Sequence, residues 1–230
     1  MVELEKFYNK VDVNFRGIDK ENDLGKRIIS LLENVIQRLP DEEQFELEAE
    51  IWFCTRRTFV ERCEEDILER GSTPTIARLI PIVNNAIAYW DANIDLVEDA
   101  IKKSPADPDG HSAVLPVIHN NDDDSKTIGG VYDISYICDL YDYRSDMYVM
   151  GVMAHELAEY SHKYNIMKEN AESLWKMKDK ARSIMFSKWA SSGYDPESEE
   201  YAEHERSVNR EAARLGFEKE IVAMDGDAAF

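Results

Sequence analysis

The stretch Gly151-Val-Met-Ala-His-Glu-Leu-Ala-Glu-Tyr-Ser-His162 decides the fold that we expect for this chain. Read as an α-helix, it places His155, Glu159 and His162 on one face, because they are spaced i, i+4 and i+7. Glu156 lies about 100° around the helix from His155. Two donor side chains one turn apart, with a carboxylate beside the first, make this helix the candidate functional site.

The segment His155-Glu-Leu-Ala-Glu159 is close to the H-E-x-x-H pattern of a zinc-binding helix. In that pattern two histidines hold the ion and the glutamate is the general base. Glu159 stands where the second histidine is expected. A carboxylate is an acceptable zinc ligand, and it makes the site harder and more anionic, which also suits manganese or iron. The alternative is a surface helix that carries histidines among many acids.

The composition predicts a globular protein with an acidic surface. The chain has 230 residues, of which 43% are hydrophobic, and a formal net charge of -20. This length supports one sizeable core, or one domain with a helical appendage. Because the surface repels phosphate and anionic lipid, we expect neither nucleic acid nor membrane as a partner.

The cysteines and the N-terminus indicate a cytoplasmic protein. Cys54, Cys63 and Cys138 are odd in number and form no C-x-x-C pair, which argues against a secreted disulfide scaffold. The first residues lack the basic and then apolar pattern of a signal peptide. No apolar run approaches the roughly 18 residues of a membrane span.

The N-terminal region, residues 1–103, is expected to be a helical scaffold with no evident chemistry. Apolar residues recur at helical spacing over 24–39 and again over 76–101. Residues 45–57 are ambiguous, because strand-forming side chains at 51–55 are flanked by acids that favour a helix.

The C-terminal region, residues 104–230, should add a small sheet and further helices. A short apolar strand is expected over 113–118, where Pro116 suggests an edge position. Residues 131–138, rich in β-branched and aromatic side chains, are the strongest strand candidate. Helical patterns follow the 155 helix and resume near Glu199. The fold class is therefore helix-rich α+β, in one compact unit.

The last predicted helix supplies partners for His155. Glu205 and Asn209 stand at i and i+4, so they share a face. A zinc site with two ligands on one helix needs a third from elsewhere, and an acceptor that holds the histidine ring. Glu205 can be that third ligand, and Asn209 can accept a hydrogen bond from the free ring N–H of His155.

A strand, a helix with H-E-x-x-x and a later helix with E-x-x-x-N together resemble the gluzincin metallopeptidases, of the thermolysin type. The run from Asn209 to Phe217 is similar to the Ala-rich end of the third-ligand helix in minimal gluzincins. The resemblance covers residues 129–217. It implies a zincin-like small sheet packed on the active-site helix, with residues 131–138 as the edge strand that aligns substrate.

Carried over position by position, the resemblance implies a role for each residue. His155 and Glu205 would hold zinc, Glu156 would be the general base, and Asn209 would orient the His155 ring. Glu159 would take the second-ligand position. The implied activity is hydrolysis of peptide bonds in a peptide or protein substrate. The alternative is a catalytically inactive protein of the same fold, with a binding or regulatory function.

Two other histidines lie close to the candidate ligands in the sequence. His162 is a possible additional donor, but it lies about 10 Å along the helix from His155, too far to share one ion easily. His204 neighbours Glu205 in the sequence, and we expect it to point to another face and be solvated. Glu159 and His162 also fit the E-x-x-H spacing of di-iron helical bundles, but no other histidine is preceded by a glutamate at that spacing.

Overall fold

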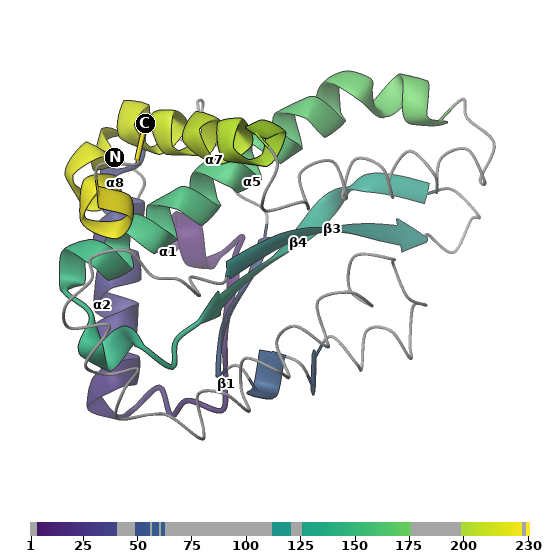
Figure 1. Ribbon diagram of the computed structural model, residues 1–230. Helices are drawn as coiled ribbons and strands as arrows, with labels where there is room; N and C mark the ends of the chain where they lie inside the picture. Colours follow the sequence, from purple (N-terminus) through teal and green to yellow (C-terminus); the bar gives the residue numbers. More distant parts are fainter. Residues whose placement is uncertain are drawn as a thin grey trace.

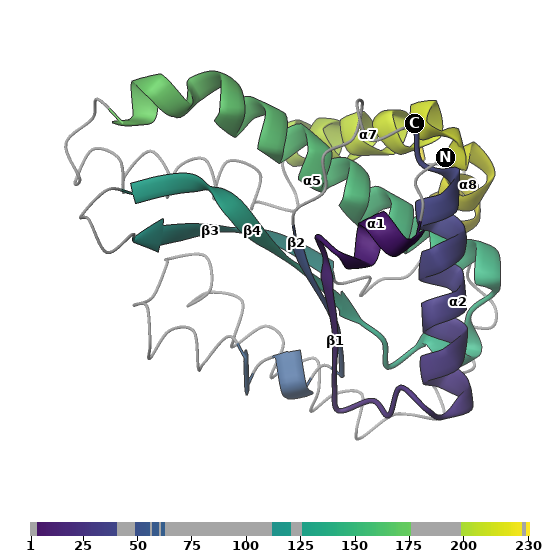
Figure 2. The same ribbon diagram turned by 180° about the vertical axis from the view of Figure 1, so that it is seen from behind.

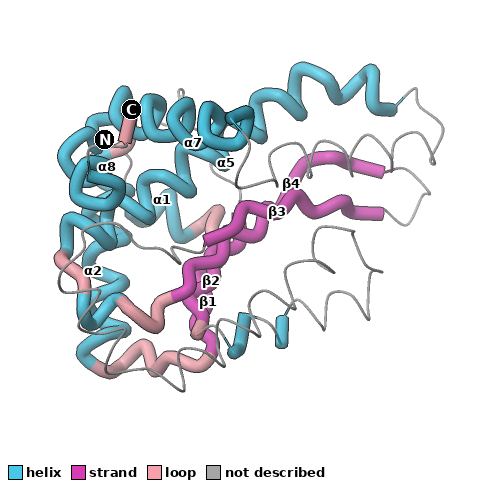
Figure 3. Tube along the Cα trace, in the orientation of Figure 1, coloured by secondary structure: helices cyan, strands magenta, loops and turns pink. Residues whose placement is uncertain are grey.

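The computed structural model describes most of the N- and C-terminal parts of the chain. The described residues are 4–40, 49–55, 57–59, 61–62, 112–120, 126–175, 199–226 and 229–230. They form a helix-rich α+β structure in which helices gather on one side of a mixed sheet (Figures 1 and 3). The predicted fold class is confirmed at this level.

The sheet is four-stranded, with the order β1-β2-β4-β3. Its strands are β1 (Asp12–Arg16), β2 (Ala49–Cys54), β3 (Ser112–Asn120) and β4 (Lys126–Ile137). β1, β2 and β4 run parallel, and β3 pairs with β4 in the antiparallel sense. Strands from both sides of residue 103 therefore build a single sheet.

The prediction of a helical scaffold over residues 1–103 is wrong at β1, and of the two alternatives left open for residues 45–57 the strand is observed. The ambiguous segment 45–57 contains the strand β2, which pairs with neighbours on both sides. Ile51 and Phe53 of this strand are completely buried. Pairing on both edges satisfies the hydrogen-bonding groups of the backbone, and burial stabilises β-branched and aromatic side chains in a strand. These tertiary contacts outweigh the preference of the flanking acidic residues for a helix.

The edge of the sheet differs from what the resemblance implied. β4, which contains residues 131–137, lies between β2 and β3 and is an interior strand. The edge strand on this side is β3, in agreement with the position of Pro116, which has no N–H to donate to a further strand. The assignment of 131–138 as the edge strand is wrong, because β2 pairs with the edge of β4 that we expected to be free.

The first long helix, α2 (Asp23–Arg38), confirms the apolar stripe predicted over 24–39. Asn22 caps it, because its side chain accepts a hydrogen bond from the Gly25 N–H at 2.7 Å. The buried face of α2 belongs to the main core, and its apolar members are Ile28, Leu31, Leu32, Val35 and Ile36.

Helix α5 (Asp146–Trp175) carries the 151–162 stretch and crosses the centre of the molecule. It lies against β4 and β3 on one side and against α7 (Glu199–Ala212) and α8 (Glu218–Asp225) on another (Figures 1 and 2). Its fully buried side chains include Met153, Leu157 and Tyr160. Because it is packed on several sides, α5 is a rigid support for its polar residues.

Two short helices and a π-helical turn belong to the same structure, and residues 57–59 and 61–62 are also helical. The two short helices are α1 (Leu4–Tyr8) and η1 (Tyr141–Tyr143), and the turn is η2 (Ala213–Phe217). η2 joins α7 to α8 and contains Gly216, whose φ of 100° is left-handed. The helix predicted to start near Glu199 and end at Phe217 is therefore present, but the chain turns at Gly216 and adds α8, which we did not predict.

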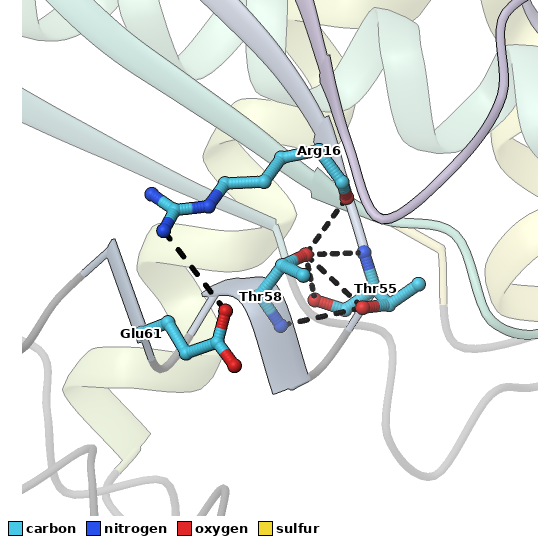
Figure 4. Close-up of polar contacts among 4 residues, drawn as sticks. All are labelled: Arg16, Thr55, Thr58 and Glu61. Carbon is cyan, nitrogen blue, oxygen red and sulfur yellow. Dashed lines mark hydrogen bonds and ion pairs between the residues drawn. The ribbon is translucent and has the colours of Figure 1, made fainter.

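A set of hydroxyl contacts holds the end of β1 to the turn after β2 (Figure 4). The Thr58 hydroxyl donates to the Arg16 carbonyl at 2.8 Å and accepts from the Thr55 N–H at 3.0 Å. The Arg16 guanidinium lies 3.9 Å from the Glu61 carboxylate, a partly exposed pair that contributes little. These contacts fix the carboxyl ends of the two parallel strands.

An arginine fixes the start of α5. The Arg27 Nε donates to the Asp146 carboxylate at 2.8 Å, and its Nη2 donates to the Arg144 carbonyl at 2.7 Å. This ties α2 to the residues where α5 begins, so the first turn of the helix that carries His155 is held from a second element.

Several sequence predictions fall on residues outside those described. They are the helix over 76–101, the part of the later helical pattern beyond Trp175, and Cys63. Of the other cysteines, Cys54 and Cys138 are buried and carry free thiols. Among the described helices, none combines the length and apolar character that crossing a membrane requires.

Candidate functional site

The candidate site lies where α5 and α7 pack side by side. His155 of α5 contacts Asn209 of α7, and Glu159, one turn later in α5, contacts the earlier residue His204, so the two helices run antiparallel here. His155 and Glu159 come from α5, and His204, Glu205 and Asn209 come from α7. The structure therefore brings the two halves of the predicted site together.

The His155 ring lies between two residues of α7. Its Nδ1 is 2.8 Å from the Asn209 Oδ1, and its Nε2 is 3.2 Å from the Glu205 Oε2. His155 is 8% exposed and Asn209 is 1% exposed, so water competes little for the contact between them. The expected approach of both Glu205 and Asn209 to this ring is observed.

Glu159 contacts a residue that we expected to be solvated. The His204 Nε2 lies 3.4 Å from the Glu159 Oε1, and the side chains are 30% and 14% exposed, respectively. The prediction that His204 points to another face is wrong, because the close packing of α7 on α5 places both His204 and Glu205 against the helix beneath. The adjacency of His204 to Glu205 in the sequence was the available signal.

A further carboxylate, that of Asp225, is hydrogen-bonded to Asn209. The Asn209 Nδ2 donates to the Asp225 Oδ2 at 2.6 Å, which brings the last turn of α8 to the site. This contact was not predictable, because we did not predict α8 and no local spacing relates the two residues.

The carboxylates around His155 dominate its electrostatics. Burial by itself would lower the pKa of His155. The hydrogen bond to Glu205 and the charges of Glu156, Glu205 and Glu159 outweigh burial and raise this pKa from 6.5 to about 10. The site thus carries an excess of negative charge in a place from which water is largely excluded, and a positive charge on the ring offsets part of it.

Glu156 is a buried carboxylate on α5. It is 5% exposed. After burial, its charge is among the causes that raise the pKa of Tyr136 and of Tyr141 well above 10. The Tyr136 hydroxyl donates to the Met153 carbonyl of α5 at 3.1 Å. Glu156 is therefore close both to His155 and to the tyrosines at the end of β4 and in η1.

The donor side chains stand as two pairs. One pair is His155 with Glu205, and the other is Glu159 with His204. Within the described part of the chain, no group of three or more His, Cys, Asp and Glu side chains is arranged to hold a metal ion. The side chain of His162 lies outside the described residues, although its backbone belongs to α5.

Comparison with known proteins adds no family to this description. No protein-family model matches the chain, and neither the curated proteins nor the solved structures yield a match.

Proposed function

We propose that this chain is a zincin-like, metal-dependent peptidase that hydrolyses peptide bonds. The observation that carries the proposal is the His155 ring, held through Nδ1 by Asn209 with its Nε2 facing the Glu205 carboxylate. A metal-ligating histidine usually has one ring nitrogen held by a hydrogen bond and the other on the ion, and a carboxylate beside that second nitrogen could share the ion.

The charges of the site favour a divalent cation. Glu156, Glu159 and Glu205 all act on one buried imidazole, and each raises its pKa. Glu156 is 5% exposed and the Glu159 side chain 14%, whereas the Glu205 side chain is 32% exposed, and the buried carboxylates need a positive partner. A proton on His155 supplies one positive charge, and a divalent ion would supply two while leaving the ring neutral.

The distance between His155 and Glu205 is close to that of two ligands on one ion, whereas Glu159 contacts His204, which we do not propose as a ligand. Two ligands that each lie 2.0–2.2 Å from a tetrahedral zinc ion are about 3.3–3.6 Å apart. The His155–Glu205 separation is 3.2 Å, and the Glu159–His204 separation is 3.4 Å. We propose His155, Glu159 and Glu205 as ligands, with zinc as the first choice and manganese or iron as alternatives because two of these ligands are carboxylates.

When bound, the ion would polarise the scissile carbonyl and acidify a water molecule. Glu156 follows His155 directly in the sequence, and we assign it the role of taking a proton from that water rather than of coordinating the ion. Asn209 would keep the His155 ring in one orientation throughout. The substrate class is a peptide or an unstructured protein segment.

A catalytically inactive protein of the same architecture is the second candidate. The observation that favours it is that, among the described residues, no three donors converge in the arrangement that the structure shows. Such a protein would use the α5–α7 surface for binding or regulation and would need no ion.

Metal analysis of the purified protein separates the two candidates. We expect about one zinc ion per chain after growth with zinc, and loss of more than about tenfold in zinc affinity in Glu205→Gln. Glu203→Gln is the matched control, because Glu203 lies on the same helix but contacts the surface side chains of Arg206 and Arg210.

The control should bind zinc as the parent does, since exposed ion pairs contribute little. A parent protein that binds no zinc, manganese or iron would reject the peptidase and leave the inactive protein. Equal zinc affinity in Glu205→Gln and Glu203→Gln would show that the ion, if present, is bound elsewhere.

A further inference from the structure

We draw no further inference here: the strongest candidate, the cluster of buried tyrosines around Tyr141 where the end of β4 and η1 meet α5, adjoins Glu156 and so belongs to the site already described, and no described residue shows what the Tyr141 hydroxyl binds.

Discussion

Replacing Gly151 with alanine should force α8 away from α5 and weaken the candidate site. Gly151 is buried one turn before His155, at the point where α8 crosses α5. An added Cβ would lie 2.9 Å from the Glu220 carbonyl carbon and 3.1 Å from the Met224 Cβ, and it would overlap the Glu220 carbonyl oxygen. Ordinary contacts begin at 3.4 Å, so the two helices are closer here than a side chain allows.

The magnitude follows from two opposing effects. Overpacking in a well-packed core costs about 1–3 kcal/mol, and the upper end applies here because a backbone carbonyl in a helix cannot rotate away. Alanine is favoured over glycine in a helix by about 1 kcal/mol. The net loss in the free energy of unfolding should therefore be about 2 kcal/mol, or about 4–8 °C in Tm for a chain of this size.

Urea unfolding followed by far-UV circular dichroism measures this loss, provided that the slope is the same in parent and variant. Gly216→Ala is the matched control, because a Cβ there meets nothing within 4 Å, while its φ of 100° still disfavours alanine. Only Gly151→Ala should also alter the Asn209 side-chain signals, since it moves the helix that carries Asp225. A Gly151→Ala midpoint at or above that of the parent would refute the reasoning.

Three further predictions concern the site and the core. Glu156→Gln should keep the fold and the metal content but abolish hydrolysis of casein, and loss of metal would make Glu156 a ligand. Glu159→His should bind zinc at least as tightly as the parent, because an imidazole adds a softer donor and removes one negative charge. Glu159→Ala should bind zinc more weakly than the parent. Equal zinc affinity of the two variants would mean that position 159 does not contact the ion. Arg38 donates to the Glu220 carboxylate at 2.6 Å. Burial would raise the pKa of Glu220, but this hydrogen bond and the charge of Arg38 lower it below 4.5. The stabilisation is thus present above pH 4.5 and lost as the pH falls through the lower pKa of the folded state. Arg38→Gln should cost about 2 kcal/mol in urea unfolding at pH 7 and less at pH 3, and an equal cost at both would exclude the ion pair as its source.

Much of the candidate site was predictable because its residues are related by their spacing within single helices. The i, i+4 relation of His155 to Glu159, and of Glu205 to Asn209, follows from the geometry of one helix. The helix over 24–39 was predictable for the same reason, since its apolar stripe and the proline that follows are properties of adjacent residues. The contact between Asn209 and His155 was predictable because an amide oxygen can accept a hydrogen bond from a ring N–H. In the structure, the Asn209 Oδ1 lies 2.8 Å from the His155 Nδ1.

The tertiary structure decided what no local pattern contains. β1 and β2 are strands because they pair with each other and with β4, and that pairing also makes β4 an interior strand. The contact of Glu159 with His204 and that of Asn209 with Asp225 depend on how α7 and α8 lie on α5. Spacing along the chain is enough to say which side chains share a helix face, because the rise and turn of the backbone set it. Which faces meet depends on the burial of the whole core, and only the packed chain determines it.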